Sequence, residues 1–290
     1  MMDGIININK DKGYTSHDVV AVLRRVLNIR KIGHTGTLDP DATGVLPVCV
    51  GKATKVCDII TDRDKTYEAK VLLGVTTDTL DTSGEILSKN EVDVSEEDIK
   101  EALDCFKGEI EQIPPMYSAI KVDGKKLYEY ARAGVEIERK SRKVTIYDIE
   151  LLDVELPYFS IRVKCSKGTY IRTLCDDIGS KLGCGAAMSE LVRTAVGRFK
   201  IEDALTLSDV EKRLNDEKIF LNIDEVFDMY PKAVIKQAAM KLLLNGNPIS
   251  FDSVVTDERS KIYRIYDDKG EFYALYKAKG NRLVVEKNFH

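Results

Sequence analysis

One segment near the N-terminus, residues 31–51 (KIGHTGTLDPDATGVLPVCVG), constrains the fold more than any other part of the chain. Its glycines and prolines exclude a long helix, because glycine favours non-helical backbone and proline lacks an amide hydrogen. The segment therefore predicts an irregular loop that leads into a buried strand at residues 45–50. Asp39 stands inside this loop, directly before Pro40.

Apolar periodicity predicts the elements around this loop. Thr15 and Asp18 have the spacing of a capping box, which favours a helix from about residue 16 to residue 28. Ser95 and Asp98 give the same signal for a second amphipathic helix. Further helices are expected at 53–60, 170–182, 188–194 and 237–244, and strands at 5–9, 65–74 and 160–166. Residues 113–156 are typical of a strand, a turn, a helix and another strand.

Composition changes near residues 229–231, and the remainder is rich in short alternating segments separated by turn residues. We therefore expect a catalytic domain at residues 1–229, with an insertion at about 113–147, and a small β-barrel domain at 230–290. About sixty residues are few for an independent core, so the second domain should dock on the first. The expected fold class is α+β, with a mixed, mainly antiparallel sheet flanked by helices.

Charge is distributed unevenly along the chain. The formal net charge of −4 alone argues against a nucleic-acid partner. However, residues 84–111 carry ten acids against three lysines, whereas residues 114–147 carry eight bases against four acids. A basic surface can therefore coexist with an acidic one.

Several classes of protein are disfavoured by the sequence. The chain has no apolar run long enough to span a membrane, and its first residues lack the pattern of a secretory signal, so the cytosol is the expected compartment. Its six cysteines include no CxxC pair, and there are only three histidines. We expect no zinc site or other metal, and cysteines that are buried as small apolar side chains.

Asp39 is the acid with the most unusual surroundings. Neighbouring glycines allow close approach of a ligand to the backbone, and Pro40 stiffens the turn. Such a carboxylate can serve as a nucleophile or stabilise a developing cation. From the loop alone, capping of a turn is the more common role for an aspartate.

Residues 33–48 (GHTGTLDPDATGVLPV) resemble the motif G-H-x-G-x-L-D-P-x-A-x-G-x-L of TruB-family pseudouridine synthases. Blocks at residues 9–20, 65–85 and 167–199 resemble further motifs of this family in the same order. Residues 113–134 resemble its RNA-clasping insertion, and the C-terminal part resembles its small PUA-like domain. The resemblance covers roughly residues 5–205 strongly and the remainder more weakly.

The resemblance implies an enzyme that isomerises the uridine at position 55, in the T loop of tRNA, to pseudouridine without a cofactor or metal. The base flips out, the N1–C1′ bond breaks, and C5 joins C1′. By resemblance, the catalytic residues are Asp39, Tyr67 and Arg172. The substrate-binding residues by resemblance are His34, Leu191 and Tyr170, and the candidate phosphate contacts are Lys10, Lys12, Lys121, Lys125 and Arg142. Attack on the sugar, addition to the base and elimination at C2′ all stay open for Asp39.

The expected partner is tRNA, bound by its T-arm stem-loop and with its acceptor stem contacted by the C-terminal domain; a monomer without membrane contact is expected. Three other functions compete with this one. A non-catalytic RNA-binding or tRNA-folding protein would not need Asp39, Tyr67 and Arg172 together. A glycoside or nucleoside hydrolase usually needs a second carboxylate, and Asp41 is the only other acid in the loop. A member of the RNA-guided branch of the superfamily is less compatible with so compact a chain.

Overall fold

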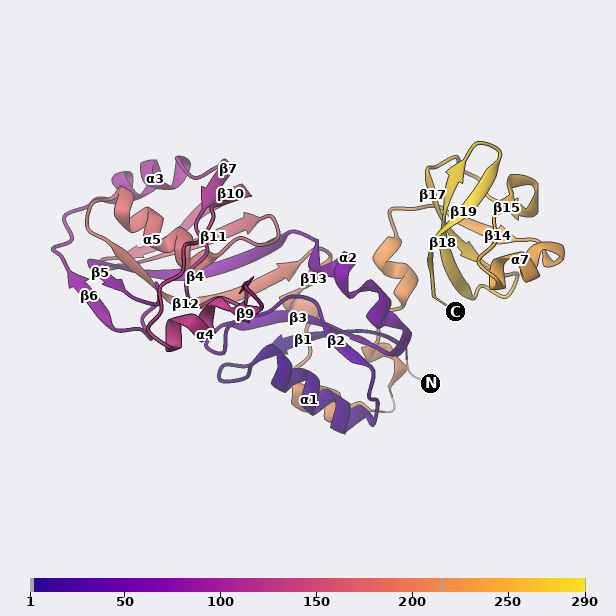
Figure 1. Cartoon of the computed structure of the whole chain (residues 1–290), viewed down its shortest axis with the longest axis horizontal. Helices are drawn as coiled ribbons and strands as arrows, with labels where there is room; N and C mark the ends of the chain where they lie inside the picture. Colours follow the sequence, from indigo (N-terminus) through magenta and orange to yellow (C-terminus); the bar gives the residue numbers. More distant parts are fainter. Residues whose placement is uncertain (1–2, 215, 290) are drawn as a thin grey trace.

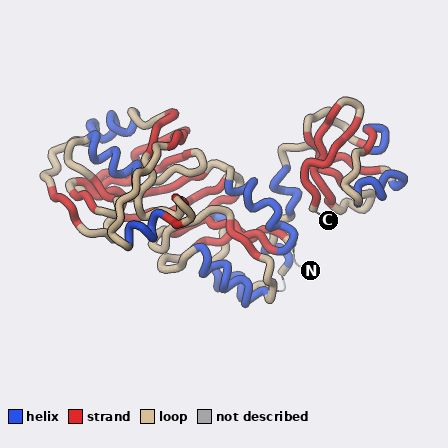
Figure 2. Tube along the Cα trace, in the orientation of Figure 1, coloured by secondary structure: helices blue, strands red, loops and turns tan. Residues whose placement is uncertain are grey.

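The computed structural model describes residues 3–214 and 216–289, which form a nine-stranded sheet, a six-stranded sheet and two two-stranded sheets. Figure 1 shows the large sheet and its helices at one end of the molecule and the C-terminal sheet at the other. A helical linker joins the two parts. Figure 2 shows that strands dominate both parts. The architecture is therefore α+β, as the sequence predicts.

The large sheet has the strand order β1-β3-β12-β4-β11-β10-β7, with β2 beside β3 and β13 beside β12. Its strands are β1 (Gly4–Lys10), β2 (Ile32–His34), β3 (Thr43–Val50), β4 (Lys65–Leu73), β7 (Gly108–Gln112), β10 (Arg142–Glu155), β11 (Tyr158–Cys165), β12 (Ala186–Val196) and β13 (Phe199–Lys200). The pairing of β3 with β12 is parallel and includes only two residue pairs, whereas the other pairings between these described strands are antiparallel. The expected mixed, mainly antiparallel sheet is confirmed.

Helices cover this sheet and connect its strands. They are α1 (Ser16–Leu27), α2 (Cys57–Thr61), α3 (Glu96–Asp104), α4 (Leu127–Arg132), α5 (Ile171–Lys181) and α6 (Leu207–Lys212). Two hairpins, β5 (Val75–Thr77) with β6 (Ile86–Lys89) and β8 (Lys121–Val122) with β9 (Lys125–Lys126), project from the main body. The second hairpin and α4 belong to the insertion expected at 113–147.

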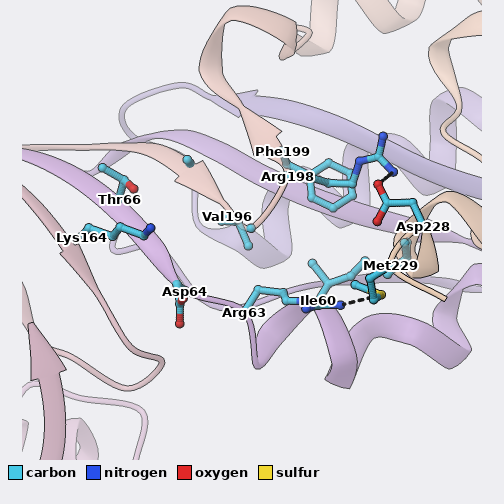
Figure 3. A pocket seen from close by; sticks show the side chains of 13 residues that line it. Ile60, Arg63, Asp64, Thr66, Lys164, Val196, Arg198, Phe199, Asp228 and Met229 are labelled. Atoms are coloured by element: carbon cyan, nitrogen blue, oxygen red, sulfur yellow. Dashed lines mark hydrogen bonds and ion pairs between the residues drawn. The ribbon is translucent and has the colours of Figure 1, made fainter. Parts of the chain in front are cut away.

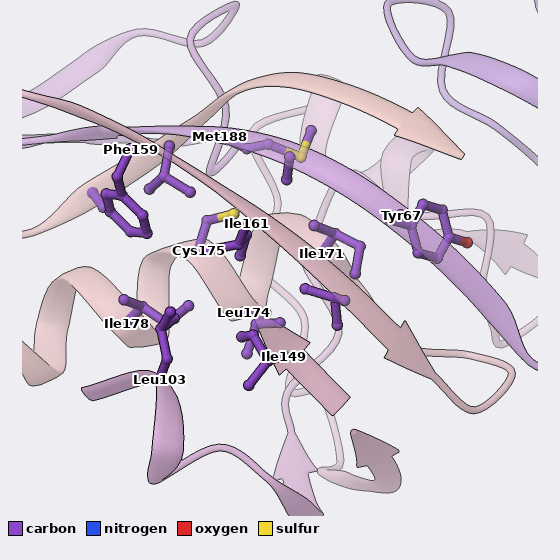
Figure 4. Close-up of a cluster of buried hydrophobic side chains, with 14 of the residues drawn as sticks. Tyr67, Leu103, Ile149, Phe159, Ile161, Ile171, Leu174, Cys175, Ile178 and Met188 are labelled. Atoms are coloured by element: carbon purple, nitrogen blue, oxygen red, sulfur yellow. The ribbon is translucent and has the colours of Figure 1, made fainter. Parts of the chain in front are cut away.

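The main hydrophobic core lies between the large sheet and helices α3 and α5 (Figure 4). Alternate residues of β4 face this core, beginning with Tyr67 and ending with Leu73. Leu103 from α3 and Leu174 and Ile178 from α5 cover them. Burial of these side chains, each worth roughly 1.5–3 kcal/mol, fixes α5 on the sheet. The N-terminal end of α5 consequently has a defined position above β4.

The C-terminal strands form a nearly closed, barrel-like sheet in the order β15-β19-β18-β17-β14-β16. They are β14 (Lys232–Ile235), β15 (Ile249–Ser250), β16 (Val254–Val255), β17 (Ile262–Tyr266), β18 (Phe272–Lys279) and β19 (Arg282–Asn288), with α7 (Met240–Leu244) beside them. Leu275 and Phe289 join an apolar cluster with Phe227 and Ile60, and Lys287 forms an ion pair with Asp58 on α2. This sheet therefore docks on the larger part of the chain.

Most predicted elements are confirmed, and the local signals explain why. Thr15 and Asp18 form the expected reciprocal capping box at the start of α1, and Ser95 and Asp98 do so at α3. The helix expected at 170–182 is α5. The helix expected at 53–60 is instead a 3-10 turn, Gly51–Val56, followed by the short helix α2.

The helix predicted at 188–194 is wrong, because these residues belong to strand β12. Met188, Leu191 and Val192 have helical spacing, but β12 is paired with β4 on one side and with β3 on the other. Register shifts near residues 189 and 194 interrupt the alternation that marks a strand. Pairing with distant strands therefore overrides the local pattern.

The cysteines follow the prediction only in part. Cys49, Cys165, Cys175 and Cys184 are buried, but Cys57 is half-buried and Cys105 is exposed. Within residues 3–214 and 216–289, the structure contains no group of three or more His, Cys, Asp or Glu side chains placed to hold a metal ion. Among the same residues, no helix is long and apolar enough to cross a membrane.

Gly44 should be the glycine of the large sheet least tolerant of a side chain. It has a φ of +101°, and a Cβ there would lie 2.3 Å from the Arg193 carbonyl oxygen on β12. We predict that Gly44→Ala lowers the free energy of unfolding by about 3 kcal/mol or more, through a clash and a strained φ. Gly108→Ala is the matched control, because Gly108 has the same φ with no atom within 4 Å. It should cost only about 1 kcal/mol in urea denaturation, and equal losses in the two variants would contradict this account.

Candidate active site

The turn that carries Asp39 is held by the residues on either side of it. The buried Leu38 donates its amide hydrogen to Ser16 Oγ at 2.9 Å, which ties the turn to the start of α1. The Pro40 carbonyl accepts hydrogen bonds from Lys10 Nζ at 3.1 Å and from the Gly13 amide at 2.9 Å. The Asp39 side chain itself remains 46% exposed. The loop is thus anchored on both sides while its carboxylate stays accessible.

Arg172 lies in the first turn of α5 and joins three segments that are distant in sequence. Its Nη2 atom is 3.0 Å from Asp39 Oδ2 and donates to the Tyr117 carbonyl at 2.9 Å. Its Nη1 atom donates to the Thr79 carbonyl at 3.1 Å and lies 3.5 Å from Asp81 Oδ2. Because the arginine side chain is only 7% exposed, these partners fix the guanidinium and orient the Asp39 carboxylate.

Asp81 supports Arg172 from a tightly bonded turn between β5 and β6. One carboxylate oxygen of Asp81 accepts from the Thr79 hydroxyl at 2.7 Å and from the Ser83 amide at 3.1 Å, and the other faces Arg172. Gly84 is required here, because a Cβ would lie 2.2 Å from Thr79 Oγ1. Asp81 is therefore occupied as a structural partner of the arginine.

Tyr67 lies on β4 at the edge of the core, 9% exposed, and its oxygen points away from the apolar cluster (Figure 4). Burial raises the pKa of its hydroxyl above the ordinary value, and the Arg193 guanidinium opposes part of this rise. The phenol is consequently protonated near neutral pH. The Asp39 charge also acts on this hydroxyl, so the two groups share one region.

Tyr170 and Leu191 also lie around this region. The Tyr170 backbone exchanges hydrogen bonds with the Gln112 side chain at 3.0 and 3.2 Å, which fixes the start of α5. Burial raises the pKa of the Tyr170 hydroxyl, and the charges of Asp39 and Arg172 act on it. Leu191 is half-buried, packs against the main core and lies opposite Ala69 of β4.

His34 lies on β2 at the start of the Asp39 loop. Its ring contacts the His17 ring edge to face, with centroids 5.0 Å apart, and its Nδ1 is 3.3 Å from the Gly36 carbonyl oxygen. Burial lowers the pKa of His34 below the ordinary value, which favours the neutral imidazole. A neutral ring suits packing against a base better than pairing with a phosphate.

Lys10 is corrected by the structure. We expected it to be a phosphate contact, but it is fully buried, and its ammonium donates to the carbonyls of Asp11, Tyr14 and Pro40. Since all three N–H groups are used, Lys10 is a clamp for the Asp39 loop. The other candidate cations, Lys12, Lys121, Lys125 and Arg142, are exposed.

Two residues of this site, Asp81 and Arg193, escaped the prediction from sequence. Asp81 lies within the T-D-T-x-D-x-x-G turn, and Arg193 lies within the L-x-R-T block. A charged residue between apolar residues is the available signal for Arg193, but the sequence predicts a helix at 188–194. Strand pairing places Arg193 directly opposite Tyr67.

A separate pocket of about 290 Å³ lies near α2, the turn between β12 and β13, and the linker (Figure 3). It is lined by Arg63, Lys164 and Arg198 together with Asp228 and Met229. Arg198 is paired with Asp228 at 3.2 Å, so part of its charge is already compensated. None of the residues around Asp39 lines this pocket, so it is distinct from the candidate site.

The candidate site can therefore present one accessible carboxylate whose orientation is fixed by a buried arginine, beside a neutral phenol. Such a set can stabilise positive charge on a sugar carbon, or bond to it, while the phenol takes part in proton transfer. Half of the carboxylate surface is open to a substrate. Because the Asp39 carboxylate lies at the protein surface, the reacting part of the substrate has to reach it there.

Comparison with known proteins identifies a family. The family model described as TruB family pseudouridylate synthase (N terminal domain) matches residues 24–171. The model described as tRNA pseudouridylate synthase B C-terminal domain matches residues 172–235.

Similar whole proteins include tRNA pseudouridine synthase B of Clostridium kluyveri, 46% identical over 99% of this chain and 100% of that protein. The protein of the same name from Alkaliphilus oremlandii is 53% identical over 86% of this chain and 83% of that one. Among solved structures, a Cbf5-Nop10-Gar1 complex contains a chain that matches with a TM-score of 0.75 and 32% identity. That match covers 99% of this chain and 85% of the other.

Lys10→Met should destabilise the protein, because it leaves three carbonyls around the Asp39 loop without their common donor. We predict a loss of about 3 kcal/mol in the free energy of unfolding, measured by urea denaturation. Lys12→Met is the matched control, since Lys12 is an exposed neighbour, and it should change the free energy by less than about 0.5 kcal/mol. A Lys10→Met protein as stable as the control would contradict the clamp.

Proposed function

The chain belongs to the TruB family of pseudouridylate synthases, and we propose that it isomerises uridine 55 in the T loop of tRNA with Asp39 as its catalytic carboxylate. The chain is a tRNA pseudouridine synthase, an isomerase. The observation that carries the role of Asp39 is its accessible carboxylate, 3.0 Å from the buried Arg172 and in the same region as Tyr67. We also propose a cytosolic location, because tRNA is the proposed substrate.

Cleavage of the N1–C1′ bond leaves positive character on the ribose and negative charge on the departing uracil. A carboxylate near C1′ stabilises the first or bonds to it, as in retaining glycosidases. Arg172 keeps Asp39 oriented for this role through their ion pair. The roles of Asp39 and Arg172 are the same whether Asp39 attacks the sugar, adds to the base or drives elimination at C2′.

Tyr67 supplies a ring for the extruded uracil and a hydroxyl for proton transfer at C5 or C2′. Leu191 provides an apolar surface under the base, and Tyr170, at the start of α5, borders the site from the side of Arg172. The half-buried position of Leu191 and the outward hydroxyl of Tyr67 support these roles.

A base within a folded T loop is not accessible, so it has to flip out of the stack. The neutral His34 ring, at the start of the Asp39 loop, supports a role in packing against the opened loop. The exposed Lys12, Lys121, Lys125 and Arg142 would contact phosphates. The hairpin β8–β9, within the insertion at 113–147, carries Lys121 and Lys125.

We also propose that the division into a catalytic domain, 1–229, and a PUA-like RNA-binding domain, 230–290, is functional. Residues 1–2, 215 and 290 lie outside the described residues. The separate C-terminal sheet, with its own core around Tyr263, Ile265 and Tyr276, supports this division. This sheet lies at one end of the molecule. There it would contact the acceptor stem of the tRNA while the T arm occupies the active site. A monomer offers both surfaces to one tRNA.

The hydrolase alternative is weakened by the arrangement of the carboxylates. A hydrolase would use a second acid near Asp39, and the nearest acid joined to the site is Asp81. Its carboxylate is engaged by Thr79, Ser83 and Arg172, so it is unavailable as a general acid. Asp41 is exposed and forms none of the ion pairs found among the described residues.

We predict that Asp39→Asn abolishes formation of pseudouridine, because the amide carries no charge to stabilise the ribose cation. The assay incubates purified protein with an unmodified T-arm stem-loop and maps pseudouridine by chemical sequencing. Asp41→Asn, two residues away in the same loop, is the matched control and should keep its activity. Turnover by the Asp39→Asn protein at the wild-type rate would overturn the assignment.

We predict that binding of the stem-loop weakens steeply with salt, because each neutralised phosphate releases a counterion. Lys121→Gln with Arg142→Gln should make the plot of log affinity against log salt shallower by about 1.5 for two lost contacts. Lys100→Gln, in the acidic stretch and paired with Glu96, should leave the slope unchanged. A wild-type slope near zero would exclude the insertion as an RNA surface.

A further inference from the structure

Arg193 is the largest fully buried side chain of the described residues, with only 1% of its surface exposed. It belongs to β12 and lies directly opposite Tyr67 on β4 and Gly44 on β3. The guanidinium is therefore at the place where these three strands meet, below the loop that carries Asp39. A charged group at such a place requires an explanation, because a buried charge costs several kcal/mol unless it is paired.

The contacts of Arg193 compensate its charge only in part. Nε donates to the Val45 carbonyl at 2.7 Å, and Nη1 is 3.4 Å from the Thr37 carbonyl oxygen, two residues before Asp39. Nη2 is buried and has no hydrogen-bond partner in the structure. No ion pair between described residues includes Arg193, in contrast to Arg172, which faces two carboxylates.

The loop is built to accommodate this side chain. A Cβ at Gly36 would lie 3.8 Å from Arg193 Nη1, and a Cβ at Gly44 would collide with the Arg193 backbone. Both glycines have positive φ angles, so the loop curves around the guanidinium. Arg193 thus fixes the beginning of the Asp39 loop at Thr37 and its end at Val45.

The same guanidinium acts on the groups around it. Burial raises the pKa of Tyr67, and the charge of Arg193 opposes part of this rise. The same charge also lowers the pKa values of Lys10, Lys65 and His34, which are already lowered by burial. Arg193 is therefore a positive centre on the inner side of the site.

We propose that Arg193 is a positioning residue for the isomerisation: its buried guanidinium holds the Asp39 loop at Thr37 and Val45 and places a positive charge on the strand position opposite Tyr67. This inference rests on the proposed roles of Asp39 and Tyr67.

A lysine would keep the charge of Arg193 but could not bond to both Thr37 and Val45 with one planar group. We expect Arg193→Lys to remain folded and to bind the T-arm stem-loop with wild-type affinity. Its single-turnover rate at saturating RNA should fall about 10²-fold, since small misplacements of reacting groups have effects of this size. Arg198→Lys, an arginine just beyond the same strand with exposed ion pairs, is the matched control and should react at the wild-type rate.

The test combines thermal melting, stem-loop affinity and single-turnover rate for wild type, Arg193→Lys, Arg198→Lys and Asp39→Asn. An Arg193→Lys rate within about threefold of wild type would overturn the inference. Loss of affinity with an unchanged rate, or an unfolded Arg193→Lys protein, would also overturn it by showing an RNA-binding or purely structural role. If wild type forms no pseudouridine, the proposed function fails, whereas an active wild type, an inactive Asp39→Asn and a fully active Arg193→Lys refute only this inference.

Discussion

The ion pair between Arg172 and Asp39 is the interaction on which the rest of the site depends. A half-exposed carboxylate on a loop would ordinarily sample many orientations, and an exposed ion pair would contribute little. Here the arginine is buried and bonded to the Thr79 and Tyr117 carbonyls and to Asp81, so its desolvation is offset before Asp39 is added. Asp39 therefore meets a cation that is already in place, and the β5–β6 turn and the insertion are fixed to the same point.

The large sheet places this ion pair beside the parallel pairing of β3 with β12. Between β3 and β12 only two residue pairs are formed, in a sheet whose other described neighbours are antiparallel and mostly longer. The Asp39 loop enters β3 at this junction, and α5 brings Arg172 to Asp39. Gly44 permits the close approach of the two strands, and Arg193 fills the space below the loop. Gly44 and Arg193 consequently support both the large sheet and the candidate site.

Local signals in the sequence predicted what depends on neighbours along the chain, such as the capping box at Thr15 and the alternation that buries Tyr67. They failed where distant segments decide. The strand at 186–196 has helical spacing of apolar residues, and only pairing with β4 and β3 makes it a strand. Lys10 was expected on the RNA surface, but three carbonyls from a folded loop surround it. Asp81 and Arg193 join the site only through tertiary contacts.

The most direct test of the central claim is a crystal structure of the Asp39→Asn protein bound to an unmodified T-arm stem-loop. The account predicts that the target uridine is flipped out, with its ring against Tyr67 and its C1′ within about 3.5 Å of the residue-39 side chain. A uridine that remains stacked in its loop, or a C1′ that lies far from residue 39 with the base away from Tyr67, would contradict it.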